Sequence, residues 1–207
     1  MSSAAPPAGL VRQFKLATES ELRVEVGQES PLRVRLVSGT AEIFGTELPP
    51  ENWLSIPPRH KFAIFTWHGA TIELEGTTEV EYVADETPMV SYVNVHAILD
   101  ARRVRSKASQ SSVLDSSQGP RVIVVGPTDS GKSSLCRMLL SWACKQGWKP
   151  TLWIWMLVRG PLLFLDVLLL HPLKCPLMKW KEFLLKCPLY IFMGTQLLVS
   201  VQSCIKF

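Results

Sequence analysis

One short run of residues restricts the possible folds of this chain more than any other part of the sequence. Residues 126–133 read Gly-Pro-Thr-Asp-Ser-Gly-Lys-Ser and match the pattern G-x-x-x-x-G-K-[ST] at every fixed position. Residues 121–125 (RVIVV) precede the match and are typical of a buried strand, and a helical pattern follows from Lys132. A strand, a glycine-containing loop and a helix in this order predict a P-loop in an α/β unit.

The predicted loop gives each of its residues a chemical role. Successive backbone N–H groups and a helix N-terminus form a concave, positive site for phosphates. We expect Lys132 to reach the β- and γ-phosphates and the Ser133 hydroxyl to bind Mg²⁺, while Asp129 shapes the turn or contacts Mg²⁺. The candidate nucleotide-binding residues of the loop are Gly126, Asp129, Ser130, Gly131, Lys132, Ser133 and Ser134.

Charge and cysteine content point to no further site. The net charge is +4, and the whole excess lies in residues 151–207, because residues 1–150 carry 16 basic and 16 acidic side chains. This balance is weak support for a nucleic-acid surface. The five cysteines show no C-x-x-C spacing, so we expect a reducing compartment and predict no zinc–thiolate site.

The first half of the chain has the texture of an antiparallel β-protein. Residues 22–26 and 32–36 alternate apolar and polar side chains, and further strands are expected at 41–44, 61–67, 71–74 and 80–83. Proline and glycine pairs separate them. We therefore predict a β-sandwich-like or barrel-like N-terminal domain over residues 14–100, after a disordered lead-in of residues 1–13.

The remaining segments follow from local composition. A helix is expected from Ser91 to about Arg103, with Val95, Ile98 and Leu99 on one face, and residues 101–119 are predicted to form a Ser/Gln-rich linker. Residues 120–151 begin the P-loop domain. Its helix carries a predicted apolar stripe and stops at Gly147. The stripe is Leu135, Leu139, Trp142 and Ala143.

Four segments occur together: residues 20–23 (SELR), 41–48 (AEIFGTEL), 65–69 (FTWHG) and 119–129 (GPRVIVVGPTD). This combination resembles the polynucleotide 5′-hydroxyl kinase family that includes the Clp subunit of pre-mRNA cleavage factor II. The resemblance runs from about residue 14 to residue 151. It implies a β-domain before a P-loop kinase domain, ATP and Mg²⁺ as cofactors, and Glu21 and Lys61 as residues that help to hold the nucleotide. It also implies subunits of the cleavage and polyadenylation factors as partners, RNA as the family substrate, and a nuclear location.

The resemblance stops after Thr151. The family continues with a strand of the type FVDLDVGQG that carries a catalytic carboxylate, whereas residues 152–160 here read LWIWMLVRG. Because Trp has the single codon TGG and Ile and Met begin with AT, a shift of one base places an Asp codon twice in this run and permits the family motif. We interpret residues 152–207 as an out-of-frame, unstructured tail. The strand and helix of the incomplete P-loop domain are then expected to lack packing partners.

These features predict an ATP-binding subunit of the pre-mRNA 3′-end cleavage and polyadenylation machinery that lacks the carboxylate strand, lid and RNA clamp of its kinase relatives. One alternative is a non-catalytic interaction fragment that presents only the N-terminal β-domain. A second is a tail-anchored membrane protein, because residues 152–170 are largely apolar. Arg159 and Asp166 argue against a membrane partner, since each charge costs about 2.5–3.5 kcal/mol at a helix centre.

Overall fold

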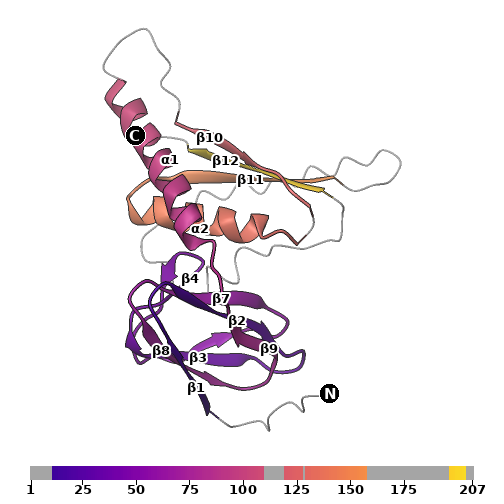
Figure 1. Cartoon of the computed structure of the whole chain (residues 1–207). Coiled ribbons are helices and arrows are strands. Elements are labelled where there is room, and N and C mark those ends of the chain that lie inside the picture. The colour runs from indigo at the N-terminus through magenta and orange to yellow at the C-terminus, as the bar shows by residue number, and fades with distance from the viewer. Residues whose placement is uncertain (1–10, 110–118, 128, 158–195, 204–207) are drawn as a thin grey trace. The chain divides into compact units, whose positions relative to one another are not determined.

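The chain divides into two compact units, residues 1–89 and 90–207 (Figure 1). The computed structural model describes residues 11–109, 119–127, 129–157 and 196–203. The first unit contains β1 (Val11–Leu16), β2 (Ser20–Val26), β3 (Leu32–Gly39), β4 (Glu42–Ile43), β5 (Thr46–Glu47), β6 (Leu54–Ile56), β7 (Lys61–Thr66), β8 (Ala70–Glu75) and β9 (Thr78–Val83). The second contains α1 (Met89–Ser109), β10 (Arg121–Val124), α2 (Lys132–Lys145), β11 (Pro150–Leu157) and β12 (Gln196–Ser203).

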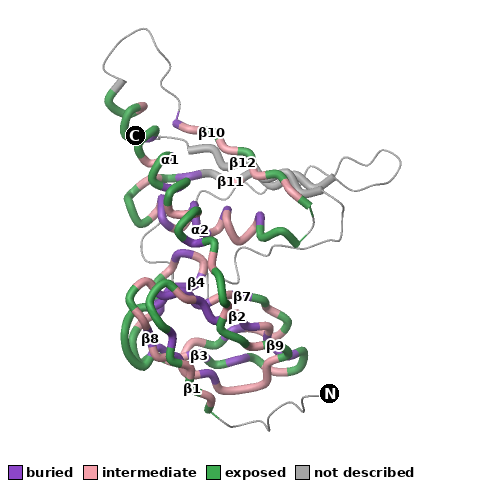
Figure 2. Tube along the Cα trace, viewed as in Figure 1, coloured by how far each residue is buried: buried purple, intermediate pink, exposed green. Residues whose placement is uncertain are grey.

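The first unit is an antiparallel β-sandwich, as the alternating sequence predicts. Its sheets have the strand orders β1-β8-β3-β6 and β5-β4-β7-β2-β9. Every second residue of β2 points inward, so Leu22, Val24 and Val26 are each at most 1% exposed. Figure 2 shows buried residues of both sheets facing one another in this unit. Burial of these two apolar faces is the main source of stability for such a fold.

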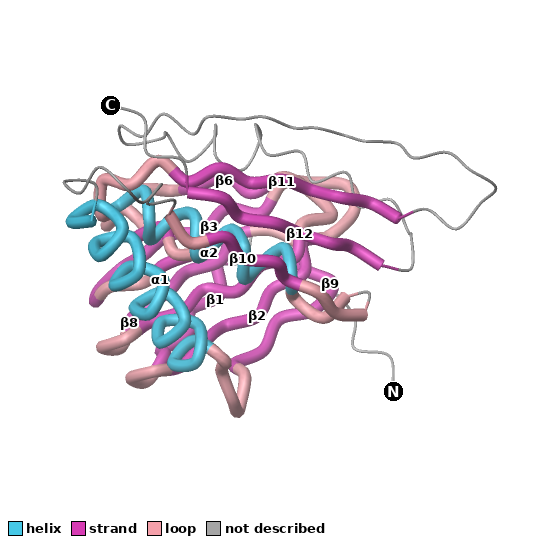
Figure 3. The backbone as a smooth tube through the Cα atoms, turned by 90° about the horizontal axis from the view of Figure 1, so that it is seen from above, coloured by secondary structure: helices cyan, strands magenta, loops and turns pink. Residues whose placement is uncertain are grey.

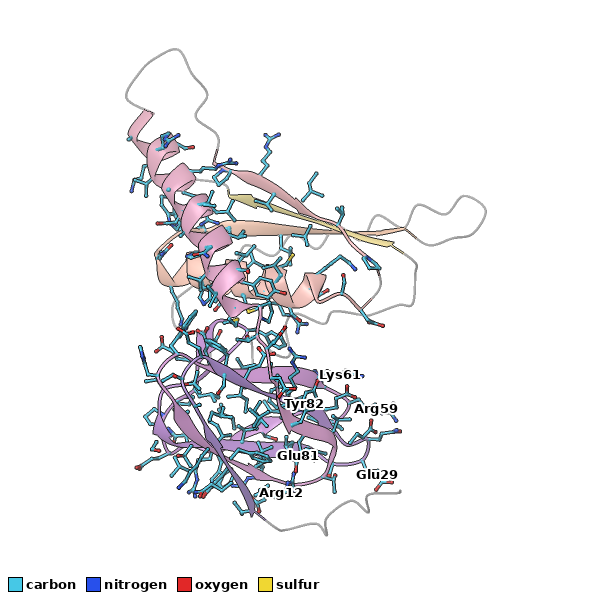
Figure 4. All side chains as sticks on the ribbon, viewed as in Figure 1. Arg12, Glu29, Arg59, Lys61, Glu81 and Tyr82 are labelled. Atoms are coloured by element: carbon cyan, nitrogen blue, oxygen red, sulfur yellow. The ribbon has the colours of Figure 1, made fainter. Side chains whose placement is uncertain are left out.

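The sandwich begins earlier than the sequence analysis suggests. Residues 11–13 belong to β1, so the predicted lead-in of residues 1–13 is wrong for its last three residues; residues 1–10 lie outside the described part. Arg12 explains the difference, because its side chain is tied to three groups of the sandwich. Its Nε lies 2.8 Å from Glu81 Oε1, and its other nitrogens donate to the Gly76 carbonyl at 2.9 Å and the Thr78 hydroxyl at 3.3 Å (Figure 4).

Helix α1 is longer than predicted. It continues through residues 101–109, where a linker was expected; residues 110–118 of that linker lie outside the described part. Its orientation also differs from the prediction, because Val95 and Ile98 are 40% and 58% exposed while His96 and Arg103 are buried. The buried positions are spaced by three, four and seven residues, but two of them carry polar side chains, which a search for apolar residues does not register.

The second unit joins an antiparallel three-stranded sheet to α2. The strand order is β10-β12-β11, and both outer strands pair antiparallel to β12, so β10 and β11 are parallel to each other (Figure 3). Cys136 and Leu140 of α2 pack against Val124 and Leu152, so the expectation that this helix lacks partners is wrong. The strand is only partly covered, because Ile123 and Val125 are 61% and 65% exposed, and the prediction of a buried strand there is wrong. Burial raises the pKa of the Cys136 thiol to about 12, which makes this cysteine a packing residue.

Two strands lie in the segment that was predicted to be an unstructured tail. β11 extends to Leu157, and β12 spans Gln196–Ser203. Their ladder runs from Pro150 opposite Ser203 to Leu157 opposite Gln196, and it pairs backbone N–H and C=O groups of the two strands. Residues 158–195 and 204–207 lie outside the described part. Among the described helices, none is long and apolar enough to cross a membrane.

Helix α2 ends where the sequence predicts. Gly147 has φ +83°, its N–H donates to the Cys144 carbonyl at 2.9 Å, and the Trp148 N–H donates to the Ala143 carbonyl at 3.0 Å. These two bonds form a Schellman motif, which terminates the helix with a glycine in the left-handed region. Leu139, Trp142 and Ala143 of the predicted stripe are buried, and Cys136, Met138 and Leu140 are buried in addition.

Side chains of α1 contact the C-terminal part of α2 and the turn that follows it. The His96 and Trp142 rings have centroids 5.5 Å apart, and the Trp148 indole N–H donates to Asp100 Oδ1 at 2.7 Å. Arg103 is only 2% exposed. Burial lowers the pKa of His96 below its ordinary value, and the charge of Arg103 lowers it further, while Asp100 and Gln146 act in the opposite direction.

Protonation of His96 is therefore expected to destabilise the second unit in mild acid. The unfolded chain binds this proton with the ordinary pKa of 6.5, whereas the folded chain binds it less readily, so stability is full above that pH and falls below it. Replacement His96→Gln removes the titrating group. Thermal unfolding between pH 7.5 and pH 5 should show a smaller loss of Tm in this variant than in the parent. Parallel curves for the two proteins would contradict the assignment.

Candidate nucleotide-binding site

The loop between β10 and α2 has the backbone of a phosphate-binding turn. Asp129 and Gly131 have φ of +59° and +77°, so both lie in the left-handed region. Gly131 is the N-cap of α2, and no side chain caps the helix there. The first backbone N–H groups of α2 therefore receive no capping hydrogen bond from residue 131, and the positive end of the helix faces the loop. These features fit an anionic ligand.

Lys132 is folded into this loop. Its side chain is almost fully buried, with 7% of the residue exposed, and its ammonium donates to the Pro127 carbonyl and to the Ser130 hydroxyl at 3.4 Å. Ser130 in turn donates to the same carbonyl at 2.9 Å. An anionic acceptor would form a stronger hydrogen bond with this buried ammonium than its present neutral acceptors do, because hydrogen bonds to charged groups are roughly twice as strong as neutral ones. The loop thus places a cation beside an uncapped helix terminus.

Further loop residues predicted from the motif lie on both sides of this lysine in the sequence. Ser133 and Ser134 lie in the first turn of α2 and are partly buried. A Cβ on Gly126 would lie 3.0 Å from the Ser130 hydroxyl oxygen, which explains why the loop tolerates only a glycine there without adjustment. In the described ranges no group of three His, Cys, Asp or Glu side chains converges on a common point.

Glu21 occupies a structural position in the sandwich. It is 5% exposed, and its carboxylate accepts hydrogen bonds from Arg23 Nε at 2.6 Å and from the Thr87 hydroxyl at 2.7 Å. The Thr87 oxygen accepts a bond from the Met89 N–H at 3.4 Å, and the Ala84 N–H donates to the Glu21 carbonyl at 2.9 Å. In this structure Glu21 fastens the segment that leads from β9 into α1.

Lys61 lies far from Glu21 along the same pair of strands. Its side chain is 74% exposed, and its ammonium is 2.9 Å from Glu25 Oε2 (Figure 4). In the register of β2 and β7, Glu21 is opposite Phe65 and Lys61 is opposite Glu25. Four positions of a strand span about 13 Å. The structure therefore does not bring these two predicted nucleotide contacts together within the first unit.

Comparison with known proteins matches both parts of this chain. Residues 15–106 match the N-terminal beta-sandwich domain of polyadenylation factor, and residues 126–154 match the mRNA cleavage and polyadenylation factor CLP1 P-loop. The two matched segments belong to the Clp1 family. This result confirms the resemblance inferred from the sequence and the order of sandwich and P-loop.

Relatives in the Clp1 family are considerably longer than this chain. A CLP1 homolog of Arabidopsis thaliana is 69% identical over 151 residues, which are 73% of this chain and 34% of the relative. The polyribonucleotide 5′-hydroxyl-kinase Clp1 of Homo sapiens is 44% identical over 139 residues, 67% of this chain and 31% of that protein. The chain spans about a third of the length of the relatives it matches.

A solved structure of the same family shows a similar fold. It has a TM-score of 0.58 and 27% identity, and it covers 72% of this chain and 33% of the other. That work describes an extended interface between Pcf11p and Clp1p and the structural basis for ATP loss in a glycine-to-arginine point mutant. A second structure, of a wild-type Clp1p–Pcf11p complex, has the same TM-score and 26% identity.

One residue near the loop was missed by the sequence analysis. The hydroxyl oxygen of Tyr92, in the first turn of α1, lies 4.0 Å from the position that a Cβ on Gly131 would take. Tyr92 is separated from the loop by more than 30 residues, so the motif gives no sign of it. Tyr92 precedes the buried His96 and Leu99 by four and seven residues, and this helical spacing could have placed it on the same face of α1.

The bond from Thr87 to Glu21 provides a test of the structural position of that carboxylate. The change Thr87→Val removes the hydroxyl but keeps the shape, which leaves the buried carboxylate with one fewer donor. We expect a loss of about 1–3 kcal/mol in the free energy of unfolding, measured with urea on the full chain. Thr71→Val, at a β8 position that faces Lys15, is the matched control and should be close to neutral. Equal effects of the two variants would contradict the assignment.

Proposed function

We propose that this chain is an ATP-binding subunit of the pre-mRNA 3′-end cleavage and polyadenylation machinery, similar to polynucleotide 5′-hydroxyl kinases. The observation that carries the proposal is the buried Lys132 ammonium inside a loop that ends at an uncapped helix. A P-loop alone indicates only that a protein binds a nucleotide. The P-loop follows a Clp1-type sandwich in the sequence, and the chain is 44% identical to a Clp1 kinase over the matched residues. Both findings support a role in pre-mRNA 3′-end processing.

Each loop residue has a distinct part in this proposal. The backbone N–H groups at the start of α2 hold the phosphates, and Lys132 exchanges its carbonyl partner for anionic oxygen. The Ser133 hydroxyl holds Mg²⁺, which neutralises charge on the phosphates when it is bound. Glu21 and Lys61 contribute from the sandwich, and Glu21 then has to exchange at least one of its present partners, Arg23 or Thr87.

Calorimetric titration of the full chain with ATP tests the nucleotide site. Lys132→Ala is expected to weaken ATP binding by about 10- to 100-fold, since a hydrogen bond to a charged group contributes roughly 1.5–3 kcal/mol. Lys149→Ala, an exposed lysine just beyond α2, is the matched control and should leave the affinity unchanged. A parent chain that does not bind ATP, or one that binds equally well without Lys132, overturns the proposal.

We further propose that the chain holds ATP without transferring its phosphate. Phosphoryl transfer needs a residue that orients the nucleophile in addition to positioning and charge neutralisation. Residues 152–160, where the family places a carboxylate-bearing strand, contain no acidic side chain. Incubation with γ-labelled ATP and a 5′-hydroxyl oligoribonucleotide should give no labelled RNA above the level of Lys132→Ala. Transfer that depends on Lys132 would contradict this statement.

A second candidate function follows from the independence of the sandwich. Residues 1–89 form a compact unit with a core of their own, so this unit can present a surface whether or not the P-loop binds a nucleotide. On this alternative the chain is a non-catalytic interaction module for cleavage-factor subunits of the Pcf11 type in the nucleus. Co-purification with such a subunit that persists in Lys132→Ala would favour the module over the ATP-dependent function.

A further inference from the structure

We propose that Tyr92 is a phosphate-binding residue of the nucleotide site. Its phenol hydroxyl donates a hydrogen bond to a phosphate oxygen that is held by the loop at the start of α2. This inference rests on the proposed ATP-binding function and extends it to a residue outside the P-loop motif. It makes α1, which the sequence motif does not include, a working part of the site.

The position of the hydroxyl is the first argument. In the described part of the chain, it lies 4.0 Å from a Cβ placed on Gly131. Gly131 directly precedes Lys132 and caps α2, so this point lies where the uncapped N–H groups begin. A tyrosine hydroxyl has one hydrogen to donate, and the phosphate oxygens are acceptors without hydrogens of their own.

Fixed contacts further along α1 are the second argument. His96 lies against Trp142, and Asp100 accepts the Trp148 indole N–H at 2.7 Å. The Lys107 ammonium lies 6.0 Å from the centroid of the Trp148 ring. These contacts belong to the same unit as the loop and hold α1 through side chains on one face. Because Tyr92 lies on this face, one turn before His96, the helix presents its hydroxyl to the loop without a rearrangement of α1.

The glycine at position 131 has two functions in this arrangement. Its φ of +77° is unfavourable for other residues, and the absence of a side chain leaves the space between the loop backbone and the Tyr92 hydroxyl open. A larger side chain would occupy the space through which the hydroxyl reaches the ligand. The hydroxyl and the backbone N–H groups can then contact one phosphate group from two sides.

The proposed hydrogen bond contacts the phosphates and not the base, so the experiment compares ligands with and without a base. Titration of the full chain with ATP and, separately, with inorganic tripolyphosphate compares a nucleotide with its phosphates alone. We expect Tyr92→Phe, which removes one oxygen and retains the ring, to lower the affinity for both ligands by about tenfold. Val95→Ala, on the exposed side of α1, is the control and should leave both affinities unchanged.

The outcomes separate this inference from the proposed function. Unchanged affinity in Tyr92→Phe, with binding that still depends on Lys132, overturns the role of Tyr92 alone. The same conclusion follows if Tyr92→Ala weakens binding while Tyr92→Phe does not, because the ring and not the hydroxyl is then important. A loss for ATP without a loss for tripolyphosphate also overturns it. If the parent binds neither ligand, the inference and the ATP site both fail.

Discussion

The hydrogen bond from the Trp148 indole to Asp100 is the contact on which the arrangement of the second unit depends. It joins the turn after α2 to the middle of α1, and the tilted contact between the His96 and Trp142 rings supports it. Since the end of α2 is itself fixed by the Schellman motif at Gly147, the position of Trp148 is determined by the helix stop. The phosphate-binding loop lies at the other end of the same helix.

Buried charge is handled differently in the two units. In the sandwich, Glu21 receives two donors, Arg23 and Thr87, so its burial is compensated by charge-assisted hydrogen bonds. In the loop, the Lys132 ammonium donates to two neutral oxygens, the Pro127 carbonyl and the Ser130 hydroxyl, which is a weaker form of compensation. A buried cation of this kind is suited to an anionic ligand, whereas the buried Glu21 is suited to its structural role.

The local pattern of the sequence was sufficient for most of the fold and for the centre of the site. Alternation of apolar residues predicted the strands of the sandwich, and G-x-x-x-x-G-K-[ST] predicted the loop between β10 and α2. Two of the errors share one cause. β1 and the last third of α1 depend on partners distant in sequence, namely Glu81 for Arg12 and α2 for Arg103, and a local pattern does not contain those partners. The same limitation hid Tyr92.

The sequence by itself determined which residues form the phosphate loop, because the conformational freedom of glycine and the charge of Lys132 are properties of the residues at those positions. It also determined the family, through the combination of sandwich and loop segments. Only the tertiary structure decided that Lys132 turns into the loop, that Glu21 is fastened by Thr87, and that Tyr92 lies beside Gly131. The contacts of Glu21 and Tyr92 join segments distant in sequence, and their geometry follows from how the helices and strands pack.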